Sequence, residues 1–222
     1  MQAVNRRIAA AASAAGRDRT AITLLAVSKT FPAVLLRRAF SAGQTHFGEN
    51  YVQEATQKIA ELSDLSMNWH FIGPVQSNKT RPIAEHFDWV HSVEREKIAL
   101  RLAEARSPER APLNICLQVN VSGEASKSGV APAEVRALAE AISRNPRLRL
   151  RGLMAIPEPT SDESLQRRRF AALRAQFDLL NRDGFGLDTL SMGMSQDLEA
   201  AIMEGATMVR VGTAIFGERT VK

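Results

Sequence analysis

The segment ITLLAVSKTFPAVLLRRAFSA, residues 22–42, contains one complete strand-and-helix unit. Its first part, residues 22–28, is a short apolar run with β-branched residues, which is typical of a buried strand. Its second part, residues 32–42, has apolar residues at helical spacing, and Pro32 suits the first turn of a helix. The segment therefore predicts a strand followed at once by a helix, which is the building unit of parallel sheets.

The same alternation continues through the rest of the chain. Further apolar runs predict strands at residues 45–48, 68–72, 89–92, 113–121, 148–156, 189–191 and 208–211. Helical spacing recurs between them, for example at residues 53–62, 95–105, 133–143, 165–182 and 197–204. Pro132 and Ser195 stand where they would begin two of these helices. The pattern favours an α/β fold, a single (β/α)₈ TIM barrel that occupies residues 1–222 as one domain.

The last strand-and-helix unit is incomplete, because few residues follow the last predicted strand. Residues 1–15 are alanine-rich with two arginines, and we expect them to form an amphipathic helix that fills the vacant place. An open, doubly wound sheet is the alternative architecture. The segment after the first strand has no glycine-rich turn, which disfavours the dinucleotide-binding form of that alternative.

Composition excludes several classes of protein. The chain has 222 residues, 45% of them hydrophobic, and a single cysteine, Cys116, which we expect to be a small buried hydrophobe. One cysteine excludes a disulfide framework within the chain and fits a reducing cytoplasm. No apolar stretch is long enough to span a membrane. A net charge of only +5, with 5% aromatic residues, disfavours nucleic-acid binding.

Lys29, at the end of the first predicted strand, is the first candidate for chemistry. Active sites of TIM barrels lie at the carboxyl ends of the strands. Side chains alternate faces along a strand, so Leu25, Val27 and Lys29 share one side, which would place the amine at the barrel rim over an apolar floor. Desolvation lowers the pKa of an amine and makes it a better nucleophile toward aldehydes. The alternative is a rim lysine paired with a carboxylate.

Two turns rich in glycine and serine follow the seventh and eighth predicted strands, where many barrels bind phosphate. Backbone amides approach an anion most closely at glycine, and hydroxyl groups add further donors. The residues that would contact an anion there are Gly193, Gly212, Gly217, Ser191, Ser195 and Thr213. Ordinary turn chemistry is the alternative, because glycine and serine mark turns in all folds.

Arg210 shares strand parity with Met208 and Gly212, so it would point into the barrel near these turns. A buried arginine needs a partner, which would be an acceptor nitrogen of a ligand or a carboxylate such as Glu49. The first and last strands are neighbours in a closed barrel, so Lys29 and a phosphate site would together hold a phosphorylated aldehyde. Pyridoxal 5′-phosphate (PLP) fits this description, and a Schiff-base aldolase acting on a sugar phosphate is the alternative.

Several segments resemble one known family. They are AVSKTFPA, HFGENYVQE, WHFIGPVQSNK, VNVSGEASKSG, RGLMAIPE, LSMGMSQDLEAAI and VRVGTAIFGER, and they occur in order from about residue 20 to residue 219. In these segments the chain resembles the YggS/PROSC family of PLP homeostasis proteins. The barrel also resembles the N-terminal domain of alanine racemases.

The resemblance implies roles for individual residues. It implies that Lys29 carries PLP as a Schiff base and that Arg210 faces the pyridine nitrogen. Gly212 and Thr213 would hold the phosphate. Ser191 and Ser195 would lie on the other side of the phosphate. Asn50 and His70 would border the cofactor, and the ring face would pack where Met154 and Ile156 lie. Lys127, after the fifth strand, would be either a solvated loop lysine or an aid to PLP entry and release by transient exchange.

The implied function is PLP binding in intracellular vitamin B6 homeostasis, as a carrier or buffer for apo forms of PLP-dependent enzymes. Related racemases use a tyrosine from an additional domain as a second base, and the only tyrosine here is Tyr51. Arg210 can only donate hydrogen bonds, so it would keep the pyridine nitrogen unprotonated and make the ring a weaker electron sink. We therefore expect a cytoplasmic monomer that is not an enzyme. The alternatives are a slow PLP-dependent racemase or lyase, and a barrel that binds a protein or nucleic acid with PLP as a sensor.

Overall fold

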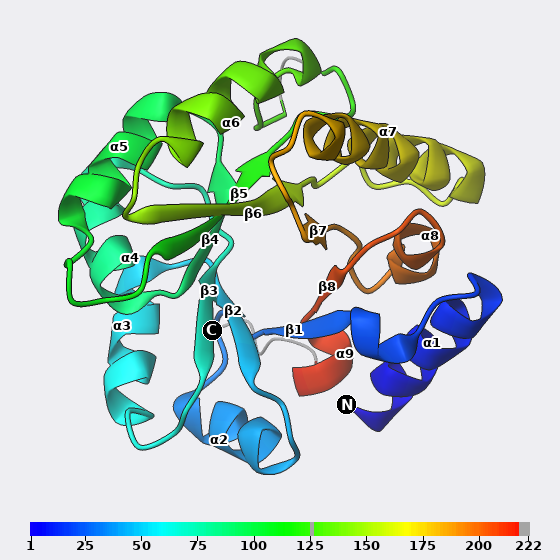
Figure 1. Cartoon of the computed structure of the whole chain (residues 1–222). Coiled ribbons are helices and arrows are strands. Elements are labelled where there is room, and N and C mark those ends of the chain that lie inside the picture. The colour runs from blue at the N-terminus through cyan, green and yellow to red at the C-terminus, as the bar shows by residue number, and fades with distance from the viewer. Residues whose placement is uncertain (125–126, 218–222) are drawn as a thin grey trace.

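The chain forms a closed barrel in the computed structural model, which describes residues 1–124 and 127–217. Parallel strands follow one another around the barrel in sequence order, and β1 closes it by pairing with β8 (Figure 1). The strands are β1 Thr23–Val27, β2 His46–Glu49, β3 Asn68–Phe71, β4 Trp89–Val93, β5 Leu113–Gln118, β6 Leu148–Met154, β7 Thr189–Ser191 and β8 Met208–Val211. The predicted TIM barrel is thus confirmed. Residues 125–126 and 218–219 of the segments that resemble a known family lie outside the described residues.

Helices surround the barrel on its outside (Figure 1). They are α1 Gln2–Ala14, α2 Ala33–Ser41, α3 Val52–Glu61, α4 Thr80–His86, α5 Glu96–Ala105, α6 Val135–Ser143, α7 Glu163–Arg182, α8 Leu198–Met203 and α9 Thr213–Phe216. Short 3₁₀ helices lie at Arg19–Ala21, Ser77–Lys79 and Pro132–Glu134. Each helix indicated by the sequence is present with its ends shifted by no more than two residues, whereas α4 and α9 were not indicated.

Helix α1 lies beside α8, where the helix of the incomplete last unit was expected (Figure 1). Its buried face includes Val4 and Ile8. Arg7 forms a two-pronged ion pair with Glu199 at the start of α8, with nitrogen–oxygen distances of 2.7 and 2.8 Å. The N-terminal helix therefore covers the barrel at the place where the described residues after β8 form the short α9.

Three predicted details are wrong. β5 ends at Gln118 rather than at residue 121, because Val119 leaves the ladder and bridges to Val130. β6 ends at Met154 rather than at residue 156, just before Pro157, which has no N–H group to donate to a ladder. Ser195 does not cap α8, because the helix begins three residues later with Asp197 at its N-cap.

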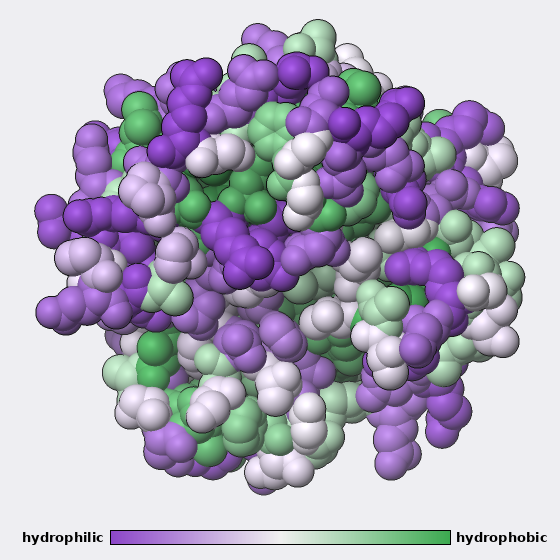
Figure 2. All heavy atoms as spheres, viewed as in Figure 1, coloured by the Kyte–Doolittle hydropathy of each residue, from purple (hydrophilic) through white to green (hydrophobic). Residues whose placement is uncertain are grey.

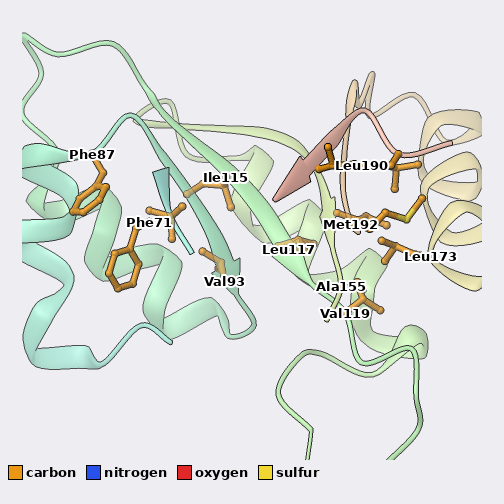
Figure 3. Packing of buried hydrophobic residues seen from close by; sticks show 14 of the residues in the cluster. Phe71, Phe87, Val93, Ile115, Leu117, Val119, Ala155, Leu173, Leu190 and Met192 are labelled. Atoms are coloured by element: carbon orange, nitrogen blue, oxygen red, sulfur yellow. The ribbon is translucent and has the colours of Figure 1, made fainter. Parts of the chain in front are cut away.

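The hydrophobic core lies mainly between the strands and the surrounding helices. Figure 3 shows this layer, in which Phe71 and Phe87 lie close to the helices and Leu117 comes from β5. A separate small cluster of Trp89, Cys116 and Met154 belongs to the opposite, inward faces of the strands. Cys116 is fully buried, as expected, and burial raises the pKa of its thiol to about 12. Most of the apolar packing thus lies outside the barrel wall, which leaves the interior open to polar side chains.

The outer surface is mostly polar. Figure 2 shows hydrophilic side chains spread over the face viewed in Figure 1, with hydrophobic residues visible between them. Among the described residues, no helix is both long and apolar enough to cross a membrane.

Candidate functional site

Lys29 lies in a turn directly after β1, where the chain leaves the barrel wall, and it is partly buried. Thr30, the next residue, has a φ of 69°, a left-handed conformation that is uncommon for a β-branched residue. Both neighbours of Lys29 are held from helix α3. The carbonyl of Ser28 accepts from Nζ of Lys58 at 2.8 Å, and the amide of Thr30 donates to Oε1 of Glu54 at 2.6 Å. These contacts fix the direction in which Lys29 leaves β1.

The contacts belong to a buried ion cluster on the outside of the barrel wall. Lys58 is 5% exposed and Glu49 is fully buried, with 2.8 Å between Nζ and Oε1. Lys58 also bonds Glu54, one helical turn away, and the hydroxyl of Ser28 donates to Glu49 at 2.7 Å. Burial raises the pKa of Glu49, while Lys58 opposes that shift. Glu49 therefore bonds Lys58 and Ser28, and the suggestion that it pairs with Arg210 is wrong.

Arg210 points into the barrel from β8, beside Leu25 of β1, and is 4% exposed. Its Nη1 donates to the carbonyl and the hydroxyl of Ser191 at 2.6 and 2.9 Å, and its Nη2 donates to the carbonyl of Ala155 at 2.9 Å. Burial lowers the pKa of Arg210 to about 10, and Asp197 acts in the opposite direction. The guanidinium is therefore charged at neutral pH. Contacts with the described residues use three of its five N–H groups.

A row of histidines continues from Ser191 through the interior of the barrel. The hydroxyl of Ser191 is 2.8 Å from Nδ1 of His91, His91 Nε2 is 2.9 Å from Nδ1 of His70, and His70 Nε2 is 2.9 Å from Nδ1 of His46. His70 and His91 are fully buried, and burial lowers the pKa of both, to about 3 for His91. Leu25, which was expected to form part of an apolar floor below Lys29, is fully buried, and the buried polar side chains of His70, His91 and Arg210 share the interior with it.

The loop after β7 lies beside Arg210 of β8. The amide of Arg210 donates to the carbonyl of Gly193 at 2.9 Å, which ties the first loop to β8. Gly193 has a φ of 91°, and a Cβ there would lie 2.5 Å from the Cβ of Ala201, so glycine is required. The carbonyl of Ser195 in this loop accepts from Arg7 of α1 at 2.9 Å. Thr213 is the first residue of α9, so its amide has no acceptor within that helix.

The other predicted residues are spread more widely. Asn50 follows β2, and its Oδ1 is buried with no hydrogen-bond partner among the described residues. Met154 is buried in the interior cluster, whereas Ile156 lies beyond β6 and is 42% exposed. Tyr51 is 54% exposed at the start of α3, and Lys127 lies in the loop after β5, partly buried.

The sequence analysis did not identify the residues that form hydrogen bonds with, and thereby position, the predicted site residues. Lys58 and Glu54 hold the turn of Lys29, and His91 holds Ser191, which holds Arg210. Strand parity is the signal that could have found the inward direction of the histidines. His46 and Gly48 lie on the same face of β2 because side chains alternate along a strand. Gly48 pairs with His70 of β3, so His70 lies on that inward face as well.

Comparison with known proteins places the chain in a family. The family described as alanine racemase, N-terminal domain, matches residues 1–220. A relative from Pseudomonas aeruginosa named pyridoxal phosphate homeostasis protein is 66% identical over 213 residues, which cover 96% of this chain and 91% of the relative. The chain belongs to the family of pyridoxal phosphate homeostasis proteins. The relatives in this family carry the name of homeostasis proteins rather than of enzymes.

Solved structures extend the comparison to the fold. PipY of Synechococcus elongatus PCC7942, solved with PLP bound, is 40% identical with a TM-score of 0.84, over 96% of this chain and 100% of PipY. Alanine racemase from Corynebacterium glutamicum is 16% identical with a TM-score of 0.71, over 98% of this chain and 61% of the racemase. At that identity, the racemase shares the barrel with the family, and its activity does not transfer.

Proposed function

We propose that this chain binds PLP as a Schiff base on Lys29 and acts in PLP (vitamin B6) homeostasis as a carrier or buffer. The observation that carries the proposal is Arg210, a buried cation whose contacts with the described residues leave two of its five N–H groups for a further acceptor. β8, which contains Arg210, pairs with β1, and Lys29 lies in the turn that follows β1. PLP bound to the relative PipY supports the identity of the ligand.

The donors present fit the polar groups of PLP. The amine of Lys29 suits the aldehyde, the guanidinium of Arg210 suits the pyridine nitrogen, and the amide of Thr213 after Gly212 suits the phosphate. Asn50 Oδ1, buried without a partner among the described residues, is ready to accept from a ligand hydroxyl or a water. The further residues that we expect to border the cofactor are His70, Met154, Ser191 and Ser195.

Holding PLP, rather than turning over a substrate, is the role that these residues favour. PLP supplies an aldehyde for the Schiff base and an electron-accepting ring. Arg210 donates only, so it leaves the pyridine nitrogen unprotonated and the ring a weaker electron sink. Tyr51 is 54% exposed at the start of α3 rather than directed into the interior, so it is poorly placed as a second base. We propose apo forms of PLP-dependent enzymes as partners, with the chain acting as a cytoplasmic monomer and a single domain.

The proposal is tested by titrating PLP into the protein and into three variants while recording visible absorbance. Wild type and Lys97→Ala, which changes an exposed lysine of α5, are expected to develop the same visible band. Lys29→Ala is expected to develop none, and Arg210→Ala to bind more weakly with a shifted band. Uptake of no PLP by the wild type, or an unchanged band in Lys29→Ala, would reject the proposal.

A further inference from the structure

Three of the four histidines in the chain form one hydrogen-bonded row along the inside of the barrel. The row begins at His46, at the start of β2, and passes through His70 of β3 and His91 of β4 to Ser191 at the end of β7. Strands in a TIM barrel run from the N-terminal mouth to the opposite mouth. The row therefore connects the N-terminal mouth with the end of the barrel at which Arg210 and Ser191 meet.

One of the two possible directions of the hydrogen bonds starts at Arg210. A guanidinium can only donate, so the hydroxyl oxygen of Ser191 accepts from Arg210 at 2.9 Å. The hydroxyl proton is then available for His91 Nδ1, which lies 2.8 Å away. A neutral imidazole that accepts at one nitrogen carries its proton on the other. His91 Nε2 therefore donates to His70 Nδ1, His70 Nε2 donates to His46 Nδ1, and the remaining Nε2 proton of His46 faces the N-terminal mouth.

The two ends of the row have different surroundings. His91 is fully buried and faces the charged Arg210, which disfavours a second positive charge. His46 is partly exposed, faces the carboxylate of Asp88 and borders a cavity of about 270 Å³ at the N-terminal mouth. An excess proton on the row therefore has its lowest free energy on His46, the end in reach of water.

Further ionisable groups stand around the row on the neighbouring elements. Asp197 of the loop before α8 and Cys116 of β5 face Arg210. Arg151 of β6 lies over the ring of Trp89, 4.6 Å from its centroid, and is itself paired with Asp188. The groups that line the cavity beside His46 include Met1, Asn5 and Arg19. The carboxylate of Asp88, between α4 and β4, favours a positive charge on His46.

We propose that His46, His70 and His91 are a proton relay that connects Ser191 and Arg210 with water at the N-terminal mouth of the barrel. A proton that reaches the hydroxyl of Ser191 displaces the hydroxyl proton to His91 Nδ1. His91 Nε2 gives its proton to His70 Nδ1, and His70 Nε2 gives its proton to His46 Nδ1. His46 then holds two protons, and it releases the one on Nε2 to water.

The proton count balances at every step. Each N–H or O–H bond that breaks is matched by one that forms on the next residue, and one proton enters for each that leaves. The row ends with its hydrogen bonds reversed, so that His91 donates to Ser191, and Ser191 keeps the incoming proton as its hydroxyl proton, which points toward the barrel end. The reversed row carries a proton in the opposite direction by the same steps. Protonation at His46 thereby determines whether Ser191 donates to His91 or toward the candidate cofactor site.

Trp89 provides a built-in reporter for this relay. Its ring stacks on His70, with 5.3 Å between centroids and an interplanar angle of 16°. The other tryptophan, Trp69, lies on the same strand as His70 but on its opposite face, next to Phe47. In a Trp69→Phe background, emission from Trp89 alone therefore reports the state of His70.

The first measurement uses ligand-free protein, so a failure of PLP binding leaves its outcome intact. Trp89 emission in the Trp69→Phe protein is expected to change in a one-proton step below pH 6.5, because burial lowers the pKa of His46. His46→Gln retains an acceptor for His70 but cannot carry the proton, so the step should disappear. His86→Gln, which changes the histidine of α4 outside the row, should retain it. No step in the parent, or an unchanged step in His46→Gln, would overturn the relay.

A second measurement uses the wild-type protein at neutral pH, so it depends neither on the stability of the fold in acid nor on the folding of the variants. At neutral pH, ¹⁵N spectra of histidine-labelled wild type contain signals from only four imidazoles, since the chain has four histidines. The relay requires His46, His70 and His91 to carry their protons on the same nitrogen, either all on Nε2 or, in the reversed row, all on Nδ1. A mixture of the two tautomers would place two N–H groups or two lone pairs opposite each other and would overturn the relay.

Discussion

Acidification from pH 7 to pH 5 should destabilise the folded chain, and His91 should account for about 2 kcal/mol of that loss. His91 is fully buried, and burial lowers its pKa to about 3 in the folded state. In the unfolded chain, its pKa returns to about 6.5. Between these two values the unfolded state binds a proton that the folded state does not, so the contribution of neutral His91 to stability is complete above pH 6.5 and declines as the pH falls toward 3.

The magnitude follows from proton linkage. At pH 5 an unfolded histidine with a pKa of about 6.5 is almost fully protonated, which lowers the free energy of the unfolded state by about 2 kcal/mol. At pH 7 protonation of the same histidine lowers the free energy of the unfolded state by only a few tenths of a kcal/mol. His70 is also fully buried with a pKa lowered by burial, so it adds to the loss in the same direction.

The assay is urea unfolding at pH 7 and pH 5, followed by far-ultraviolet circular dichroism. His91→Gln keeps groups that can bond Ser191 and His70 but removes the titration, so its loss of stability between the two pH values should be smaller by about 2 kcal/mol. His86→Gln is the matched control, since it removes a histidine outside the row, and it should lose as much as the wild type. Equal losses in His91→Gln and wild type would refute the reasoning.

Three further predictions follow from particular contacts. Lys58→Met leaves the buried carboxylate of Glu49 without its cation and should lower the free energy of unfolding by about 3–5 kcal/mol in urea denaturation, against about 0–1 kcal/mol for the exposed Arg37→Met. Gly152→Ala would place a Cβ 1.7 Å from the carbonyl oxygen of Thr189, so its thermal midpoint should fall clearly below wild type; an unchanged midpoint would contradict the packing. Lys127→Ala should slow PLP transfer to an apo-enzyme. An unchanged transfer rate would show that Lys127 does not take part in PLP entry and release.

The barrel was predictable because each strand-and-helix unit carries its own signals. Short apolar runs and helical spacing are local, so they marked every strand and most helices. The ends of β5 and β6 were not predictable in the same way. Their apolar runs continue past Gln118 and Met154, and only the pairing of Val119 with Val130 and the missing donor of Pro157 end the ladders.

The candidate site was predictable only where strand parity applied. The position of Lys29 at the end of β1 and the inward direction of Arg210 both follow from alternation along one strand. Lys58 gave no such signal, because a helical lysine is usually solvated, and its burial depends on Glu49 from a different element. The histidine row needed the register between β2, β3 and β4, which a single sequence does not contain.

The most direct test of the account is borohydride reduction of the PLP-loaded protein, followed by digestion and peptide mass analysis. A Schiff base on Lys29 predicts that reduction abolishes the visible band and leaves the added mass on the peptide that contains Lys29. Added mass on another lysine, or on none, would contradict the central claim.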